Sequence, residues 1–425
     1  MIQREIAPVL APLSEPALLP YRTLTLDNGV EVVYIHDSSQ EVFKLDAVFE
    51  AGAYYQSRPL VASTAINMLN EGTRFHTAEE IADVFDFYGA YTDYNSGFNK
   101  SELSLIALTK YARETVSMLA EMLTDSIVPE KELEIFLTNK RQEFLVDNEK
   151  TSYLARKKFS EVFFGSTHPY SNAVTEQDYL QVTPGMVREF YRRYIHARRC
   201  RVMLCGNVGG QALEAVAECF GRLRRPDGEF WRGPQPFAPA PVGRYHVEKG
   251  NTVQSSLRIG KSGVRLGEED YAGFMLLNAV LGGYFGSRLM SNIREDKGYT
   301  YGISSFNVSM PQGSYWCIAT DVHNEYVGET IEEVFKEIRR LKEEPVGEEE
   351  LMLVKNYLHG DLLRELDGVF AQSDALKHKL NYHTDNRIYL DLIRRIKDCT
   401  AEDLLRLAGR YWDTEEMYVV TAGKG

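Results

Sequence analysis

The chain has 425 residues, of which 44% are hydrophobic and 26% charged, so it is long enough to bury two or more cores. Its net charge of −13 and the lack of an extended Lys/Arg run argue against a nucleic-acid partner, and we interpret the acidic balance as solubility. No run of about 18 apolar residues is present, which predicts no membrane-spanning helix.

The N-terminal segment and the cysteines bear on location. Proline recurs from Pro8 to Pro20 and Glu5 adds a charge, so we expect no signal peptide. The five cysteines are odd in number and show no CxxC spacing, which is typical of reduced thiols. We therefore expect a cytoplasmic protein.

The first half of the chain carries mixed helix and strand patterns. In chain order they predict a hairpin around Asp27-Asn28-Gly29, a strand at LDAVFEAGA, helices at 59–71 and 77–88, strands at AYTDYN and SELSLIAL, a helix at 111–123, a long charged helix from Pro129 through the 150s, a loop at HPYSNAV, a helix at 184–194 and a buried strand at RVMLCGNV.

Residues 222–244 differ from their surroundings, because they hold five prolines and follow no helical or alternating period. We interpret this segment as a linker. Beyond it the patterns predict strands at YHVEKG and TVQSSLRIG, a helix at 269–281, a strand at SYWCIATDV, helices from about Glu325, Gly347, Phe370 and Ala401, and a last strand at MYVVTAG.

The same helix–loop–strand unit occurs at the end of the first region and at the end of the second. Arg193-Tyr194 and Arg410-Tyr411 each close a helix, and a strand ends at a glycine, Gly206 or Gly423, thirteen residues after each arginine. The sequence thus predicts an α+β fold of two similar halves, each a largely antiparallel sheet flanked by helices. The expected boundaries are 1–221 for the first half, 222–244 for the linker and 245–425 for the second half.

The stretch 277–305 is the most distinctive part of the second half. It reads as a helix end, a glycine-rich turn, an amphipathic helix over 287–296 and an aromatic strand from Tyr299, with Gly298 ending the helix. Arg294 and Tyr301 flank this stop, seven residues apart. A guanidinium and a phenol placed together are able to hold and polarise a peptide carbonyl, although they cannot cleave it alone.

Taken together, these motifs resemble the pitrilysin/insulinase-type zinc peptidases, a family that includes the mitochondrial processing peptidase. The resemblance covers nearly the whole chain. It rests on the order and spacing of TLDNGVEVV, NEGT with TAEEIADVFDFYGAYTDYN, the HPY loop before TEQDYLQVTPGMVREFYRRY, LGGYFGSRLMSNIREDKGYTYGISS, and PVGEEELMLVKNYLHGDLLRELDGVFAQSDAL.

Active members of that family carry HxxEH on a helix before the GT turn, where two His bind zinc and the Glu is the general base. At those positions this chain has Ser63, Ile66 and Asn67, and Glu143 lies where the third ligand is expected. A hydroxyl and an amide bind zinc weakly, and isoleucine accepts no proton. We therefore expect no metal and no cofactor, with Glu143 a solvated carboxylate.

The remaining histidines do not supply a replacement. His378 and His383 are five apart and do not share a helix face, and His359 has no partner at helical spacing. His76 precedes a helix start, where capping is its expected role. A peptidase with a different metal site stays open as an alternative that a measured zinc content would test.

The resemblance implies that Arg294 and Tyr301 contact the scissile carbonyl at the zinc of another domain or subunit. The alternative is that Arg294 pairs with a nearby acid and Tyr301 packs in its strand. The family also implies that Ala90, Tyr91, Thr92, Asp93 and Tyr94 form an edge strand to which substrate peptide adds.

We therefore expect a metal-free subunit that is inactive alone. It would bind peptide and complete the active site of a homologous zinc-bearing subunit in a heterodimer, or pair with itself in a homodimer. The alternative from another class is a non-enzymatic scaffold of the same fold. The first predicts that Arg294 and Tyr301 affect peptide cleavage, and the second that they affect assembly alone.

Overall fold

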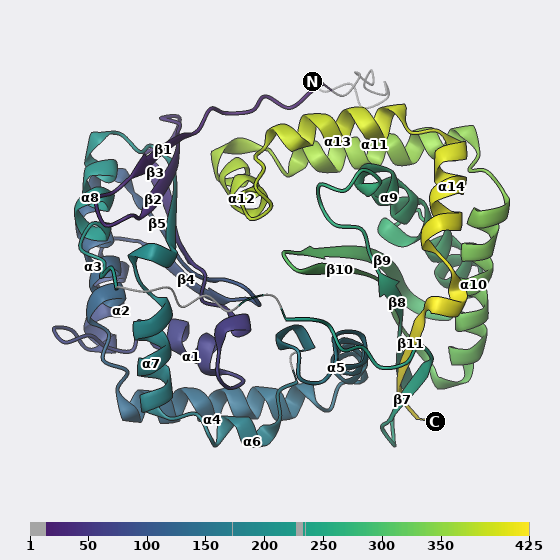
Figure 1. Cartoon of the computed structure of the whole chain (residues 1–425), viewed down its shortest axis with the longest axis horizontal. Helices are drawn as coiled ribbons and strands as arrows, with labels where there is room; N and C mark the ends of the chain where they lie inside the picture. Colours follow the sequence, from purple (N-terminus) through teal and green to yellow (C-terminus); the bar gives the residue numbers. More distant parts are fainter. Residues whose placement is uncertain (1–13, 172, 227–232, 234, 425) are drawn as a thin grey trace, which may run out of the picture.

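The computed structural model describes residues 14–171, 173–226, 233 and 235–424. Two mixed sheets lie on opposite sides of the molecule, each beside its own set of helices (Figure 1). This confirms the α+β class with two sheet-and-helix halves. The domain boundaries at 221/222 and 244/245 stay a prediction. Across the described residues, no helix is both long and apolar enough to cross a membrane.

The first sheet has the strand order β1-β2-β6-β3-β5-β4, and every neighbouring pair is antiparallel except β2 and β6. Its strands are Arg22–Thr25 (β1), Glu31–His36 (β2), Val42–Phe49 (β3), Tyr91–Ser96 (β4), Ser101–Leu108 (β5) and Cys200–Gly206 (β6). The helices of this half of the sequence are Val61–Asn67 (α1), Ala78–Phe87 (α2), Ala112–Asp125 (α3), Glu130–Asp147 (α4), Thr151–Phe164 (α5), Glu176–Tyr179 (α6), Pro184–Tyr194 (α7) and Gly210–Phe220 (α8).

The second sheet has the order β7-β11-β8-β10-β9, and only β7 and β11 are parallel. Its strands are Arg244–Glu248 (β7), Gln254–Ser262 (β8), Thr300–Met310 (β9), Gly313–His323 (β10) and Tyr418–Gly423 (β11). The helices are Tyr271–Asn278 (α9), Val327–Glu343 (α10), Glu348–Arg364 (α11), Gly368–Leu380 (α12), Arg387–Asp398 (α13) and Ala401–Tyr411 (α14), with π-helical turns at Ala279–Gly283 and Met290–Asp296.

The two sheets share one topology. Without β1, the first sheet repeats the second in strand order and in the direction of every pair. The glycines that end the two repeated units also match: Gly206 approaches the start of β3 at Val42, and Gly423 approaches Ser255 in β8. Both have positive φ and no room for a Cβ atom, so glycine is required at each. This agrees with the predicted duplication.

One helix of each half packs on the sheet of the other half. Helix α5 lies on β8 and β11, where Phe159 and Phe163 join a buried cluster with Tyr418 and Val420. Helix α12 lies on β2 and β6, where Leu376 is buried. Each sheet is thereby covered on one face by its own helices and on the other by a helix from the opposite half (Figure 1).

A buried ion cluster joins α12 to the first sheet. Lys377 Nζ on α12 lies 2.8 Å from Asp46 Oδ2 on β3 and also contacts Glu102 on β5. Asp374 bonds Lys44 Nζ at 2.6 Å and Lys377 Nζ at 3.1 Å. Burial disfavours the Lys377 ammonium, but the two neighbouring carboxylates of Asp46 and Glu102 outweigh it and raise the pKa of Lys377.

Three sequence predictions need correction. The long charged helix is two helices, α4 and α5, separated at residues 148–150. The helix predicted over 287–296 is π-helical over most of its length, from Met290 to Asp296. Helix α13 was not predicted, although its apolar positions at Leu392, Ile393 and Ile396 follow helical spacing.

The five cysteines are all buried and free, as predicted for reduced thiols.

Replacing Lys377 by methionine should lower the free energy of unfolding by about 3 kcal/mol, because Asp46 (1% exposed) and Glu102 would lose the cation between them, and Lys44, 3.4 Å from Asp46, offsets that loss only in part. The matched control is Lys140→Met, which breaks an exposed pair with Glu143 on one helix and should cost at most about 1 kcal/mol. Chemical denaturation measures both. Equal losses would contradict a structural role for the buried cluster.

Candidate functional site

Helix α1 carries the positions where active relatives of the resembled family hold zinc. Ile66 is fully buried in the first core, so this position contributes packing only. Ser63 and Asn67 are half-buried and lie one turn apart. The Ser63 hydroxyl donates to the Leu60 carbonyl at 3.0 Å, and the Asn67 amide donates to the Ser63 carbonyl at 2.8 Å. Both polar side chains therefore bond to their own helix.

Glu143, the position of the third ligand, lies on α4 and is 62% exposed. Its carboxylate pairs with Lys140 at 2.8 Å, three residues earlier on the same helix. This is the solvated carboxylate that was predicted. Among the residues that the structure describes, no group of three or more His, Cys, Asp or Glu side chains is arranged to hold a metal ion.

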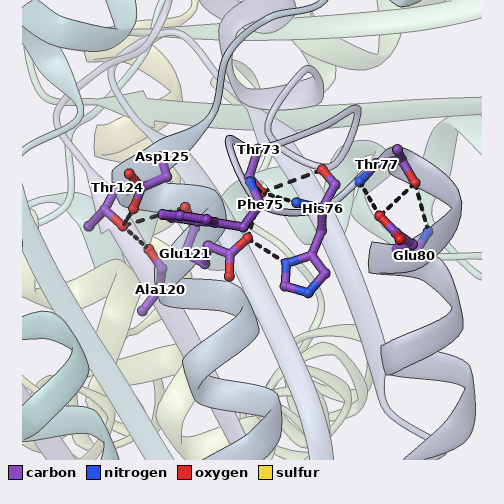
Figure 2. A network of polar contacts seen from close by, with 9 residues as sticks. All are labelled: Thr73, Phe75, His76, Thr77, Glu80, Ala120, Glu121, Thr124 and Asp125. Atoms are coloured by element: carbon purple, nitrogen blue, oxygen red, sulfur yellow. Dashed lines mark hydrogen bonds and ion pairs between the residues drawn. The ribbon is translucent and has the colours of Figure 1, made fainter.

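Two of the histidines considered as metal ligands, His359 and His76, have structural partners. His359 bonds the Ser14 carbonyl at 3.2 Å. His76 does not cap a helix, contrary to the prediction. Its Nδ1 lies 2.8 Å from Glu121, and Thr77 caps α2 through a reciprocal pair of bonds with Glu80 (Figure 2).

Arg294 and Tyr301 lie together, although they come from different elements. Arg294 is on the π-helical turn Met290–Asp296, and Tyr301 is near the start of β9. The guanidinium carbon of Arg294 lies 5.9 Å from the centre of the Tyr301 ring and 4.6 Å from the centre of the Phe285 ring. Two aromatic rings therefore orient the guanidinium by cation–π contacts. Phe285 was not predicted, because it reaches Arg294 across the glycine-rich turn.

The environment of the pair differs from that of a structural ion pair. The nearest acid to Arg294 is its chain neighbour Glu295, at a loose 3.9 Å, and 29% of the Arg294 side chain is exposed. Tyr301 is 93% exposed and so does not pack in its strand. Both polar ends are accessible to an external carbonyl or carboxylate.

A β-bulge sets the direction of Tyr301. The register between β9 and β10 shifts between Thr320 and Val322, opposite the start of β9. The Thr300 hydroxyl lies within 3.1 Å of the Asp321 carbonyl and both backbone groups of Gly302, and Thr320 donates to it at 2.9 Å. These buried hydroxyls hold the bulge, so Thr300 acts as a positioning residue for Tyr301.

Hydrogen bonds and close packing also fix the glycine-rich turn that precedes Arg294. Asn278 bonds the Ser305 carbonyl at 3.1 Å and accepts from the Trp316 indole at 2.7 Å. Gly282 lies so close to Ser305 that a Cβ atom would not fit. Arg288 forms a two-point bond with Glu350 at 2.8 and 2.9 Å, with only 12% of its side chain exposed. Arg288 is thus held in a buried two-point ion pair, whereas the nearest carboxylate to Arg294 is at 3.9 Å.

The predicted peptide-binding segment forms β4, an edge strand paired only with β5. Ala90 precedes the strand and bonds the Phe85 carbonyl at 2.8 Å. Tyr91 and Asp93 are exposed, whereas Thr92 and Tyr94 are half-buried, and burial raises the pKa of Tyr94 to about 12. Tyr301 lies on β9, which is likewise an edge strand but of the other sheet, and Arg294 lies on the π-helical turn before β9.

The chain is similar to known proteins in sequence and in fold. The model of the peptidase M16 inactive domain matches residues 181–358. An uncharacterized zinc protease of Bacillus subtilis, YmxG, is 23% identical over 353 residues, covering 81% of this chain and 84% of that protein.

Two solved structures share the fold over nearly the whole chain. A peptidase M16 inactive domain from Pseudomonas fluorescens matches with a TM-score of 0.84 at 23% identity, covering 96% of this chain and 99% of that one. A protease from Helicobacter pylori matches with a TM-score of 0.87 at 17% identity, covering 96% and 100%. The chain is therefore similar to proteins of the peptidase M16 family in sequence and in fold, and it has Ser63, Ile66 and Asn67 at the positions of the HxxEH zinc motif.

Proposed function

We propose that this protein is the metal-free subunit of a two-chain peptidase, in which it binds peptide and lends Arg294 and Tyr301 to the active site of a homologous zinc-bearing subunit. The observation that carries the proposal is the state of this pair. A phenol that is 93% exposed and a guanidinium without a close carboxylate add little to the stability of this chain, yet buried polar bonds hold the surrounding backbone in place.

The chemistry of the pair fits this role. Hydrolysis at a zinc ion places negative charge on the oxygen of the scissile carbonyl, and donors aimed at that oxygen stabilise the transition state. A guanidinium always carries its charge, and a phenol donates one hydrogen bond. Neither residue supplies the nucleophile, so this half of a site needs the zinc-bound water and the general base of a partner. Both the cytoplasmic location and the heterodimer belong to this proposal.

The free edge of β4 offers a way to hold the substrate. An extended peptide would pair with unpaired backbone groups of Tyr91 to Tyr94, which makes recognition depend on the backbone more than on side chains. Asp93 is exposed on this strand and would favour a basic residue in the peptide.

The test combines this chain with a pitrilysin-type chain that carries an intact HxxEH motif, and measures peptide cleavage. Arg294→Ala and Tyr301→Phe should each lower kcat by about 10²-fold, since each removes one donor to the developing oxyanion. The matched control is Arg339→Ala, an exposed arginine on α10, which should leave kcat unchanged.

Gel filtration of the same mixtures separates the two function classes. If Arg294→Ala keeps full activity in the assembled complex, the role in the partner's active site is wrong. If the variants reduce the amount of assembled complex and leave the rate per complex unchanged, the protein is a scaffold.

The zinc content of the purified chain tests the prediction that it has no zinc site. After loading with zinc and gel filtration, the wild-type chain should retain far less than equimolar zinc, because Ser63 and Asn67 offer weak ligands. The double variant Ser63→His with Asn67→His places two imidazoles one turn apart and should gain saturable zinc binding. The single variant Ser63→His is the control and should gain little. Equimolar zinc in the wild-type chain would revive an unrecognised metal site.

A further inference from the structure

A pocket of about 470 Å³ in the N-terminal half is lined by a concentration of positive charge. It lies where the C-terminal end of α3, helix α7 and the segment after α8 meet. Five of its lining residues are arginines, in a chain whose net charge is −13. They are Arg74, Arg188, Arg192, Arg222 and Arg224.

Separate parts of the sequence bring these arginines together. Arg188 and Arg192 are one turn apart on α7, and Arg222 and Arg224 follow α8. Arg74 is in the loop before α2, and its backbone N–H bonds the Asp125 carbonyl at 3.1 Å. A polar network holds this loop against α3 (Figure 2).

In that network Thr73 is the central residue. Its hydroxyl donates to Glu121 at 2.5 Å and accepts the backbone N–H groups of Phe75 and His76, while His76 Nδ1 lies 2.8 Å from the same carboxylate. Thr73 is only 4% exposed, so the loop that carries Arg74 is firmly anchored. The position of Arg74 at the pocket is therefore built into the fold.

Like charges repel, so the charges that offset the arginines must be counted. Arg222 pairs with Glu218 at 2.7 Å, and Arg74 lies 3.9 Å from Asp125. The recorded hydrogen bonds of Arg188 and Arg224 run to the carbonyls of Val128 and Arg192. The C-terminal ends of α3, α7 and α8 add partial negative charges of roughly 0.5 each, which leaves an excess of roughly one to two positive charges.

The rest of the lining is of two kinds. Leu123, Ile127, Ile195 and Leu223 supply an apolar surface. Ser126 supplies a hydroxyl that is buried without a hydrogen-bond partner, a state that is unfavourable unless a ligand atom pairs with it. A ligand that suits this lining carries an anionic head with several acceptor oxygens and an apolar body.

We propose that this pocket binds a small organic phosphate monoester. Such a group carries a charge of about −1.5 to −2 at neutral pH, which matches the excess of positive charge, and its oxygens suit guanidinium donors. The volume is that of a small-molecule site. The inference is independent of the proposed peptidase role, because Arg294 and Tyr301 lie in the other half of the chain and do not line this pocket.

Calorimetric titration of the full-length chain with phenyl phosphate tests the site. We expect saturable binding that Arg192→Gln and Arg188→Gln each weaken about tenfold, and that Ser126→Ala weakens less. Arg339→Gln on α10 is the matched control and should bind like the wild type. Thermal unfolding without ligand checks that each variant is folded. No binding at about 10 mM, or equal binding by all variants, would overturn the proposal.

Two further titrations test the chemistry of the ligand. Inorganic phosphate should bind more weakly than phenyl phosphate, because it leaves the apolar lining unused, and equal affinity would overturn the organic part of the proposal. Affinity for phenyl phosphate should rise as the pH increases through about 6, where the second proton leaves the phosphate. Benzoate, with a single negative charge, should bind least, and tighter binding of benzoate would exclude a phosphate site.

Discussion

The exchange of α5 and α12 between the two halves is the constraint on which the rest of the structure depends. Each sheet would expose an apolar face without the helix from the other half, so neither half has a complete core on its own. The two contacts differ in kind. Helix α5 packs on its sheet through aromatic side chains. Helix α12 is held on its sheet by Lys377, which lies between Asp46 and Glu102. A buried ion pair adds little net stability but specifies one arrangement, since every shifted register leaves a charge unpaired.

This arrangement explains how the residues at the zinc-site positions can differ from HxxEH without any change of the fold. The residue at the general-base position, Ile66, now packs in the first core, and Ser63 and Asn67 bond their own helix. These changes are local to α1. Arg294 and Tyr301 depend on a different sheet, on the bulge at Thr300 and on the turn below Asn278. The α1 positions and the Arg294–Tyr301 pair are held by separate contacts, so substitutions at one need not disturb the other.

Much of the fold was predictable because its signals are local. The hairpin at Asn28, the antiparallel sheets and the repeated helix–strand unit follow from turn residues and from periodicity. The helix exchange was not predictable, since no local pattern says on which sheet an amphipathic helix packs. The spacing of Arg294 and Tyr301 indicated a pair, but their orientation depends on Phe285 and on the Thr300 bulge, which are contacts made by folding.

The arginine pocket likewise could not be predicted from the net charge of the chain. A net charge of −13 excludes a broad basic surface, yet five arginines from three parts of the chain meet at one cavity. Glu218 and Asp125 offset only two of them, and the ends of three helices offset part of the remainder. Arg74 and Arg222 are 72% and 70% exposed, so solvent screens part of their repulsion, and an anion in the cavity would offset the remainder. The charges around a cavity, counted together with the groups that face them, therefore indicate its ligand better than the net charge of the whole chain does.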